Sequence, residues 1–321
     1  MSVIVTGGAG FIGSCLVRML NDKGIEDILI VDNIAGTEKW KNLINKKYLE
    51  YIHKDAFLDR LQSYKGITHI LHMGACSSTT EKDFDYLCQN NLEYTKALWT
   101  YCTEHQIHFI YASSAATYGD GRQGFSDQCD IKELRPLNGY GYSKQLFDLW
   151  VEKQQSKPAQ YVGLKFFNVY GPNEYYKDAM ASVIFHGYRQ VKESGRLKLF
   201  KSCHPDYADG GQLRDFVYVK DICKVIGYFM DQPEVCGLFN VGTGRAESFE
   251  KLGESVFKAL GRETEIDYIE MPEKLRKKYQ YYTRADMDKL KAVGYSTDFY
   301  SLEDGIVDYV QNYLEPGFRT Y

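Results

Sequence analysis

The sequence lacks several features that would assign it to a specialised class of protein. No apolar stretch approaches the ~18 residues that a membrane-spanning helix needs, and the first apolar run already begins at Val3, so we expect no signal peptide. Basic and acidic residues are nearly balanced, 39 against 43, and the densest basic run, 275–278, is interpreted as a solvated helix end. We therefore expect a cytoplasmic protein that binds neither nucleic acid nor a membrane.

The eight cysteines also lack the patterns that are typical of disulfide frameworks or metal sites. They include no C-x-x-C pair, and in a reducing compartment they are most simply free thiols. Cys102, His105 and His108 lie close together in the sequence, as do His69 and His72, but neither group completes a four-ligand pattern. We predict no metal site. The 321 residues contain no internal repeat and suffice for one large or two medium domains.

A glycine-rich turn near the start of the chain is the first feature that points to a ligand. A short β-branched run over residues 3–5 is followed by Gly7, Gly10 and Gly13, and residues 14–20 carry apolar side chains at helical spacing. Strand, tight turn and helix start together aim backbone N–H groups at an anion, typically a dinucleotide pyrophosphate. The alternative is a glycine turn without a ligand.

The second predicted strand, residues 27–31, bears on the choice of cofactor. It ends at Asp32 and Asn33, and an acidic residue at this place typically receives the adenosine ribose hydroxyls, which favours NAD. Lys39 and Lys54 follow and could neutralise the 2′-phosphate of NADP. From their spacing alone, ordinary surface charge is the better interpretation of both lysines.

A further predicted strand, residues 67–73, runs into small residues that would let a flat cofactor lie close to the backbone. A simple strand-to-loop transition is the alternative. Asn90 and Asn91 follow in a helical segment, where an inward amide could hydrogen-bond either a loop or the cofactor.

A hydroxyl-rich strand end and a tyrosine–lysine pair predict proton-transfer chemistry. The predicted strand 109–119 carries three hydroxyl side chains towards its end, Ser114 among them. Tyr140 and Lys144 stand at i and i+4, so both project from one helix face. A neighbouring ammonium and a cationic nicotinamide ring favour the phenolate, which makes Tyr140 a candidate general base with Ser114 holding the same alcohol. The alternative is an exposed pair at a helix start.

The glycine turn, Ser114 and Tyr140-x-x-x-Lys144 resemble the extended short-chain dehydrogenase/reductase family, which acts on nucleotide sugars. The resemblance implies a doubly wound parallel Rossmann-type α/β sheet with a smaller, discontinuous α/β substrate domain. Stretches such as 74–81 and 239–249 are more specific and are similar to the branch of that family that acts on ADP-heptose.

That branch implies an epimerase that inverts C6 of the heptose in ADP-D-glycero-D-manno-heptose. The route is transient oxidation to a 6-keto intermediate with tightly bound NADP, NAD being possible, and the product serves lipopolysaccharide core synthesis. The family also implies a homo-oligomer, a pentamer. Rival interpretations are another NAD(P)-dependent epimerase or reductase, such as a UDP-hexose 4-epimerase, and a non-enzymatic NADP sensor or scaffold. Ala115 and Ala116 argue against a 4,6-dehydratase, which usually needs an Asp-Glu pair there.

Residue roles follow from these two lines of argument. The predicted catalytic residues are Tyr140, Ser114 and Lys144, with Lys177 added as a second base by resemblance only. Lys144 is expected to orient the nicotinamide ribose and to lower the Tyr140 pKa. The predicted cofactor contacts are Gly7, Gly10, Phe11, Ile12, Gly13, Asp32, Asn33, Lys39, Lys54, Met73, Gly74, Ala75, Cys76, Ser77, Asn90, Tyr140, Lys144, Val169 and Lys177. The predicted substrate contacts are Ser114, Asn168, Ala179, His186, Phe200, Arg214 and Tyr279.

Some positions depart from the family pattern. Ala179 stands where a serine is usual, and Met73 stands where an acidic residue is usual, so its cofactor contact would be through the backbone. The loop 202–213 is longer than in the family, which weakens the assignment of Phe200. We predict a cofactor domain of residues 1–167 with segments near 214–241 and 296–313, and a substrate domain of 168–213 and 242–295.

Overall fold

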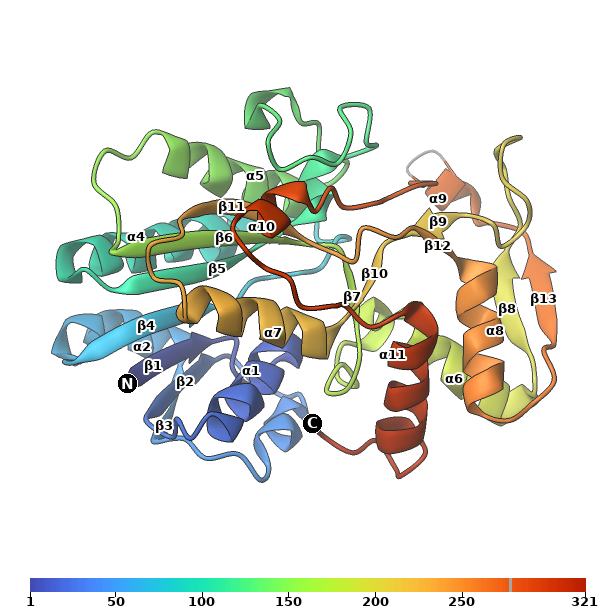
Figure 1. Ribbon diagram of the computed structural model, residues 1–321, viewed down its shortest axis with the longest axis horizontal. Coiled ribbons are helices and arrows are strands. Elements are labelled where there is room, and N and C mark those ends of the chain that lie inside the picture. Colours follow the sequence, from blue (N-terminus) through green and yellow to red (C-terminus); the bar gives the residue numbers. More distant parts are fainter. Residues whose placement is uncertain (277–278) are drawn as a thin grey trace.

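The computed structural model describes residues 1–276 and 279–321 (Figure 1). Its centre is a seven-stranded sheet in the order β11-β6-β5-β4-β1-β2-β3, in which every neighbouring pair is parallel. The predicted fold class is thereby confirmed. The strands of this sheet are β1 Ser2–Thr6, β2 Ile28–Asp32, β3 Glu50–His53, β4 Ile67–His72, β5 His108–Ser114, β6 Gln160–Phe166 and β11 Gly237–Val241.

Helices cover both faces of this sheet, which explains why its strands read as almost continuous apolar runs. Successive residues of β1 alternate between two cores. Val3 and Val5 join the core that includes Leu16 of α1 (Phe11–Asp22) and Val225 of α7 (Val219–Met230). Ile4 joins the other core, which includes Trp99 of α4 (Tyr94–His105) and Phe147 of α5 (Gly139–Glu152). The remaining α-helices are α2 Lys54–Arg60, α3 Phe84–Leu87, α6 Val183–Ser194, α8 Phe249–Ala259, α9 Glu273–Arg276, α10 Asp288–Ala292 and α11 Leu302–Tyr309.

Three small sheets lie beyond the carboxyl end of the main sheet (Figure 1). They pair β7 (Asn168–Tyr170) with β10 (Phe216–Tyr218), β9 (Leu213–Arg214) with β12 (Glu247–Ser248), and β8 (Leu197–Phe200) with β13 (Ile266–Ile269). The turn predicted to start at Asn168 is wrong, because this segment pairs with β10 as a strand. The short strand β3 was also missed.

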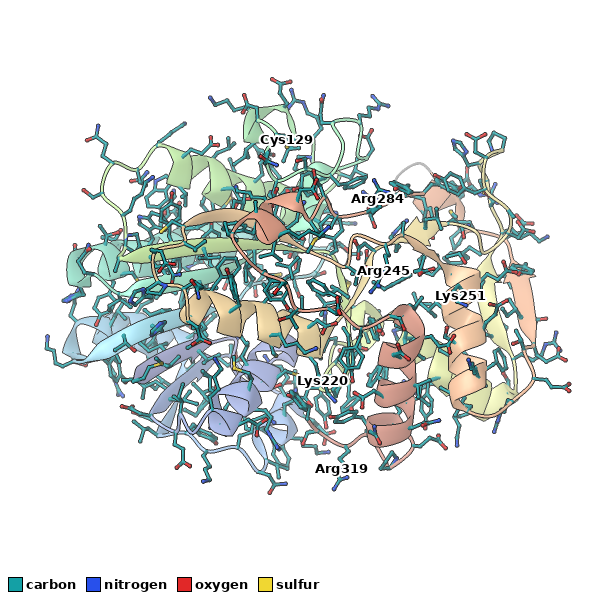
Figure 2. All side chains as sticks on the ribbon, viewed as in Figure 1. Cys129, Lys220, Arg245, Lys251, Arg284 and Arg319 are labelled. Atoms are coloured by element: carbon teal, nitrogen blue, oxygen red, sulfur yellow. The ribbon has the colours of Figure 1, made fainter. Side chains whose placement is uncertain are left out.

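The helix α11 belongs to the predicted cofactor domain, yet it contacts both halves of the chain. It packs against α8, where Lys258 pairs with Glu303. Lys220 at the start of α7, labelled in Figure 2, pairs with Asp308 of α11 at 2.6 Å. The division into two domains therefore stays a prediction.

The following findings on membrane helices, metal ligands and cysteines apply to residues 1–276 and 279–321. Within them, no helix is both long enough and apolar enough to span a bilayer, and no cluster of three potential metal ligands is found. The eight cysteines are free thiols. The basic run 275–278 begins in α9, whereas Lys277 and Lys278 lie outside the described residues.

A buried ion pair fastens α5 to β6, the strand next to the edge strand β11. Lys165 of β6 lies 3.0 Å from Asp148 of α5, and each side chain is only 1% exposed. Ser113 donates to the same carboxylate at 2.8 Å, and Lys165 also donates to Thr117 at 2.6 Å. Because α5 carries Tyr140 and Lys144, this network sets their height above the sheet.

Replacing Lys165 with methionine should strongly destabilise the fold, because it leaves the Asp148 carboxylate buried without its counter-charge. We expect a loss of about 3–5 kcal/mol of unfolding free energy, measured by urea denaturation. The matched control is Arg196→Met in the exposed pair with Asp267, which should cost at most about 1 kcal/mol. Equal losses in both variants would contradict this account.

Candidate active site

The main candidate site is a cavity of about 520 Å³ at the carboxyl ends of β1, β4 and β5. In open α/β sheets, ligands bind at this edge. The cavity brings together residues that are far apart in the sequence. Of the predicted residues, it is lined by Gly7, Gly10, Phe11, Ile12, Gly13, Asp32, Lys39, Met73, Gly74, Ala75, Ser77, Ser114, Tyr140, Lys144, Asn168, Val169 and Lys177.

The glycine turn forms the floor of the cavity and has no room for side chains. A Cβ at Gly13 would stand 2.1 Å from the Gly7 carbonyl oxygen, and one at Gly7, where φ is +67°, would stand 2.7 Å from the Gly74 nitrogen. Gly10 caps α1 without a side chain, so the first N–H groups of the helix face the cavity. A cradle of this shape and polarity fits a dinucleotide pyrophosphate.

Asp32 holds the glycine turn through a hydrogen bond and also pairs with Lys39. Its Oδ2 accepts from Ala9 N at 2.9 Å, and its Oδ1 accepts from Asn33 N at 2.7 Å and from Lys39 Nζ at 2.8 Å. Lys39 is 24% exposed and pairs with a carboxylate that is 7% exposed, and its contact with the cofactor stays a prediction. Lys54 pairs with the exposed Asp55 at 2.6 Å.

A second, smaller cavity of about 210 Å³ adjoins the first at the end of β2. Asn33, Lys39, Lys54, Cys76 and Asn90 all line it, so the predicted residues at the acidic strand end converge there. Its wall thus carries two ammonium groups beside one buried carboxylate.

The two neighbouring asparagines have different tasks. Asn91 is buried and holds the loop after β4, accepting from Cys76 N at 2.8 Å and donating to Cys76 O at 3.0 Å and to Ser143 Oγ at 3.0 Å. Asn90 donates to Tyr86 O at 2.8 Å and lines the second cavity. Asn91 therefore holds the loop, and a cofactor contact of Asn90 stays a prediction.

Ser114, Tyr140 and Lys144 meet above the end of β5. Burial raises the pKa of the Tyr140 phenol, and a hydrogen bond with Ser114 opposes that rise. Lys144 donates to Ala112 O at 2.8 Å, and burial lowers the pKa of its ammonium to about 8. The expectation that neighbouring protein groups lower the Tyr140 pKa is wrong, because burial of the phenol outweighs its hydrogen bond with Ser114.

Lys177 reaches the same cavity from the loop between β7 and α6. Its ammonium lies 5.3 Å from the centre of the Phe11 ring. Burial lowers the pKa of Lys177, and the nearby Glu174 carboxylate opposes this shift. Two groups that can exchange protons, Tyr140 and Lys177, therefore face one space from different elements.

Arg214 lies just behind the cavity wall. Its guanidinium stacks on Tyr279 at 5.3 Å and on Phe249 at 5.7 Å, and Phe249 itself lines the cavity. The guanidinium donates to the carbonyls of Leu213, at 2.8 Å, and Gln280. Arg214 and Tyr279 are thus brought together, although neither lines the cavity wall.

The other predicted substrate contacts stay outside the cavity lining. Ala179 is exposed, and the His186 ring packs edge-on against Phe185 in α6. Phe200 ends β8, where its carbonyl accepts from Gly210 N at 3.2 Å. Their assignment to substrate binding stays a prediction.

Sequence reasoning missed several residues that shape the cavity. Asn42 donates to Ala9 O and Asn173 O, both at 3.1 Å, and Asn173 donates to Ser14 Oγ at 2.9 Å. These contacts join segments that are far apart in the chain, so no local pattern could reveal them. The missed lining residues include Asn42, Asn173, Tyr176, Met180, Ser182 and Phe249.

Comparison with known proteins agrees with this geometry. The model of the NAD dependent epimerase/dehydratase family matches residues 3–242. The chain belongs to this family. Membership in the NAD dependent epimerase/dehydratase family accounts for the dinucleotide cradle, and the cofactor class is NAD or NADP.

Relatives within this family indicate a narrower group. The chain is 54% identical over 315 residues to the ADP-L-glycero-D-manno-heptose-6-epimerase of Nitratidesulfovibrio vulgaris strain DP4, covering 97% of each chain. It is 49% identical to the protein of the same name from Fusobacterium nucleatum, covering 97% of this chain and 98% of the relative.

Solved structures of epimerases also match this chain over nearly its full length. The Helicobacter pylori ADP-L-glycero-D-manno-heptose-6-epimerase matches with a TM-score of 0.83 and 28% identity, covering 97% of this chain and 95% of the other. The Thermus thermophilus UDP-glucose 4-epimerase, solved with NAD, matches with a TM-score of 0.77 and 26% identity, covering 97% and 98%. The chain thus shares its fold with epimerases of different nucleotide sugars.

A methyl group at the glycine turn should abolish cofactor retention. Gly13→Ala places a Cβ against the Gly7 carbonyl, which cannot withdraw without opening the turn. We expect the purified variant to lose its bound dinucleotide, measured by absorbance and by release on denaturation. Gly36→Ala is the control, since a Cβ there meets no atom within 4 Å, and retention should be unchanged. A loaded Gly13→Ala protein would contradict the assigned cradle.

Proposed function

We propose that this chain inverts C6 of the heptose in ADP-D-glycero-D-manno-heptose, giving ADP-L-glycero-D-manno-heptose, with tightly retained NADP. The observation that carries the proposal is that Tyr140 and Lys177 line one cavity together with Ser114. Inversion needs proton exchange with the same oxygen in two orientations of the sugar. The names of the relatives support the choice of substrate.

The protein groups divide the work as follows. NADP, held at the glycine turn, supplies a reversible hydride acceptor when bound. Tyr140 takes the proton of the C6 hydroxyl, while Ser114 holds that oxygen by a hydrogen bond. Lys177 gives a proton to the oxygen when the flat ketone presents its other face. Lys144 orients the ribose of the bound cofactor.

The second cavity supports NADP over NAD. Asp32 already accepts two backbone N–H groups and Lys39, so it is poorly placed to accept ribose hydroxyls as well. The Lys39 and Lys54 ammonium groups beside it suit a 2′-phosphate. We therefore assign these two lysines to cofactor selectivity.

One assay tests the proposed reaction. The purified protein, with no added cofactor, should convert ADP-D-glycero-D-manno-heptose to the L-glycero epimer, followed at C6 by NMR. Tyr140→Phe and Lys177→Met should each lower the rate by about 10²–10⁴-fold, because each removes a proton-transfer group. Tyr142→Phe, on the exposed side of the same helix, should keep the wild-type rate. A folded, loaded protein that inverts only a UDP-hexose would refute the substrate, and full activity of Lys177→Met would remove its role.

Cofactor selectivity has its own test. The double variant Lys39→Ala/Lys54→Ala should weaken NADP binding by about tenfold or more and leave NAD binding unchanged, measured by calorimetry on protein stripped of cofactor. Lys41→Ala is the control, because Lys41 pairs with Glu38 outside both cavities. Equal losses for both dinucleotides would contradict the assignment.

The expected assembly rests on the family resemblance alone, whereas the expected location rests on composition and apolar runs. The homo-oligomer, a pentamer, and the cytoplasmic location stay predictions, as does the absence of nucleic-acid and membrane partners. Sedimentation of the purified protein tests the first of these.

A further inference from the structure

Glu174 is a buried carboxylate to which the proposed reaction gives no role. It lies in the loop between β7 and α6, and its side chain is 0% exposed. This loop supplies a wall of the main cavity through Asn173, Tyr176, Lys177 and Met180. A charged group at such a place is costly unless something nearby compensates it.

Hydrogen bonds to Glu174 close the loop at both ends. Its Oε2 accepts from Ser182 N at 2.6 Å, and its Oε1 accepts from Ser182 Oγ at 2.7 Å and from Gly171 N at 3.3 Å. The Ser182 hydroxyl in turn accepts from Phe185 N at 3.1 Å and caps α6. One carboxylate thus joins the end of β7 to the start of α6.

The same carboxylate acts on Lys177. Lys177 N donates to Glu174 O at 3.0 Å, which places the two residues on one tight turn, and the Lys177 ammonium lies over the Phe11 ring of α1. Glu174 raises the Lys177 pKa, whereas burial lowers it. The other titratable groups around Lys177 are Tyr140 and Lys144 of α5, Asp32 and Lys39 at the far end, Tyr176, and the exposed Asp178. Those near the Glu174 carboxylate are Tyr175, Tyr309 of α11 and Cys15 of α1.

We propose that Glu174 is a positioning residue that fixes the loop carrying Lys177 and keeps the Lys177 ammonium charged for proton donation. The purpose of this proton rests on the proposed function. Burial raises the pKa of Glu174, whereas its hydrogen bonds from Ser182 and Gly171 and the Lys177 ammonium favour its ionised form. A neutral acceptor could tie the loop together, but only the ionised form also offsets the desolvation of the neighbouring ammonium. This is the reason for a carboxylate, rather than an amide, at a fully buried position.

Competitive labelling with trace acetic anhydride, from neutral to alkaline pH, measures the pKa of Lys177 by mass spectrometry without any need for activity. Glu174→Gln should lower this pKa by about one unit. Glu174→Asp, which withdraws the carboxylate by one methylene, should lower it less. Ser182→Ala loosens the loop but keeps the charge, so the pKa should stay at the wild-type value. The exposed Lys198 is the internal reference in every sample.

The outcomes separate charge from loop shape. An unchanged Lys177 pKa in folded Glu174→Gln, or an equal fall in Ser182→Ala, would overturn the proposal. If Glu174→Gln does not fold, Glu174→Asp takes its place. An unchanged Lys177 pKa in Glu174→Asp would then overturn the proposal. In the inversion assay, the rate should fall at alkaline pH as Lys177 loses its proton. In Glu174→Gln this fall should begin at a lower pH than in the wild type. Failure of the wild type to invert refutes the proposed function, while the labelling still decides the role of Glu174.

Discussion

The close approach of two backbone segments at the floor of the cavity governs the rest of this structure. The glycine turn passes so near the end of β4 that a side chain at Gly7 would overlap the backbone of Gly74, and the turn is so tight that one at Gly13 would overlap the Gly7 carbonyl. The turn is then held from two directions, by Asp32 through Ala9 and by Asn42. Since Asn42 also binds the loop after β7, the position of the turn is transmitted to the opposite wall of the cavity.

Both lysines at the site are built in the same manner. Lys144 and Lys177 are each buried deeply enough that desolvation favours loss of the proton, and each has an acid nearby on its own segment, Asp148 or Glu174. The acid acts against the desolvation in both cases. In two separate segments of the chain, burial therefore lowers the pKa of a lysine and a neighbouring carboxylate limits that fall.

The sequence could predict those parts of the fold and site that depend on local spacing. The parallel strands follow from short apolar runs, and the glycine turn and the Tyr140–Lys144 pair follow from spacings of three and four residues. Contacts across the fold were beyond its reach, as with Asn42 and Asn173, or the stacking of Arg214 on Tyr279. The strand β7 was mistaken for a turn because only three residues pair there before the chain reaches Gly171 and Pro172. The pKa of Tyr140 was misjudged because spacing does not report burial.

The order of strands in the main sheet bears on how the protein is made. After β1, the next two strands along the chain add to one side of it, and β4, β5, β6 and β11 then add in turn to the other side. Each strand that leaves the ribosome thus meets an edge that is already formed, and no strand must be inserted between two earlier ones. The glycine turn and the ends of β4 and β5 precede, along the chain, the loop that carries Lys177 and the later Phe249, which also line the cavity. One wall of the cavity is therefore synthesised before the segments that form the opposite wall.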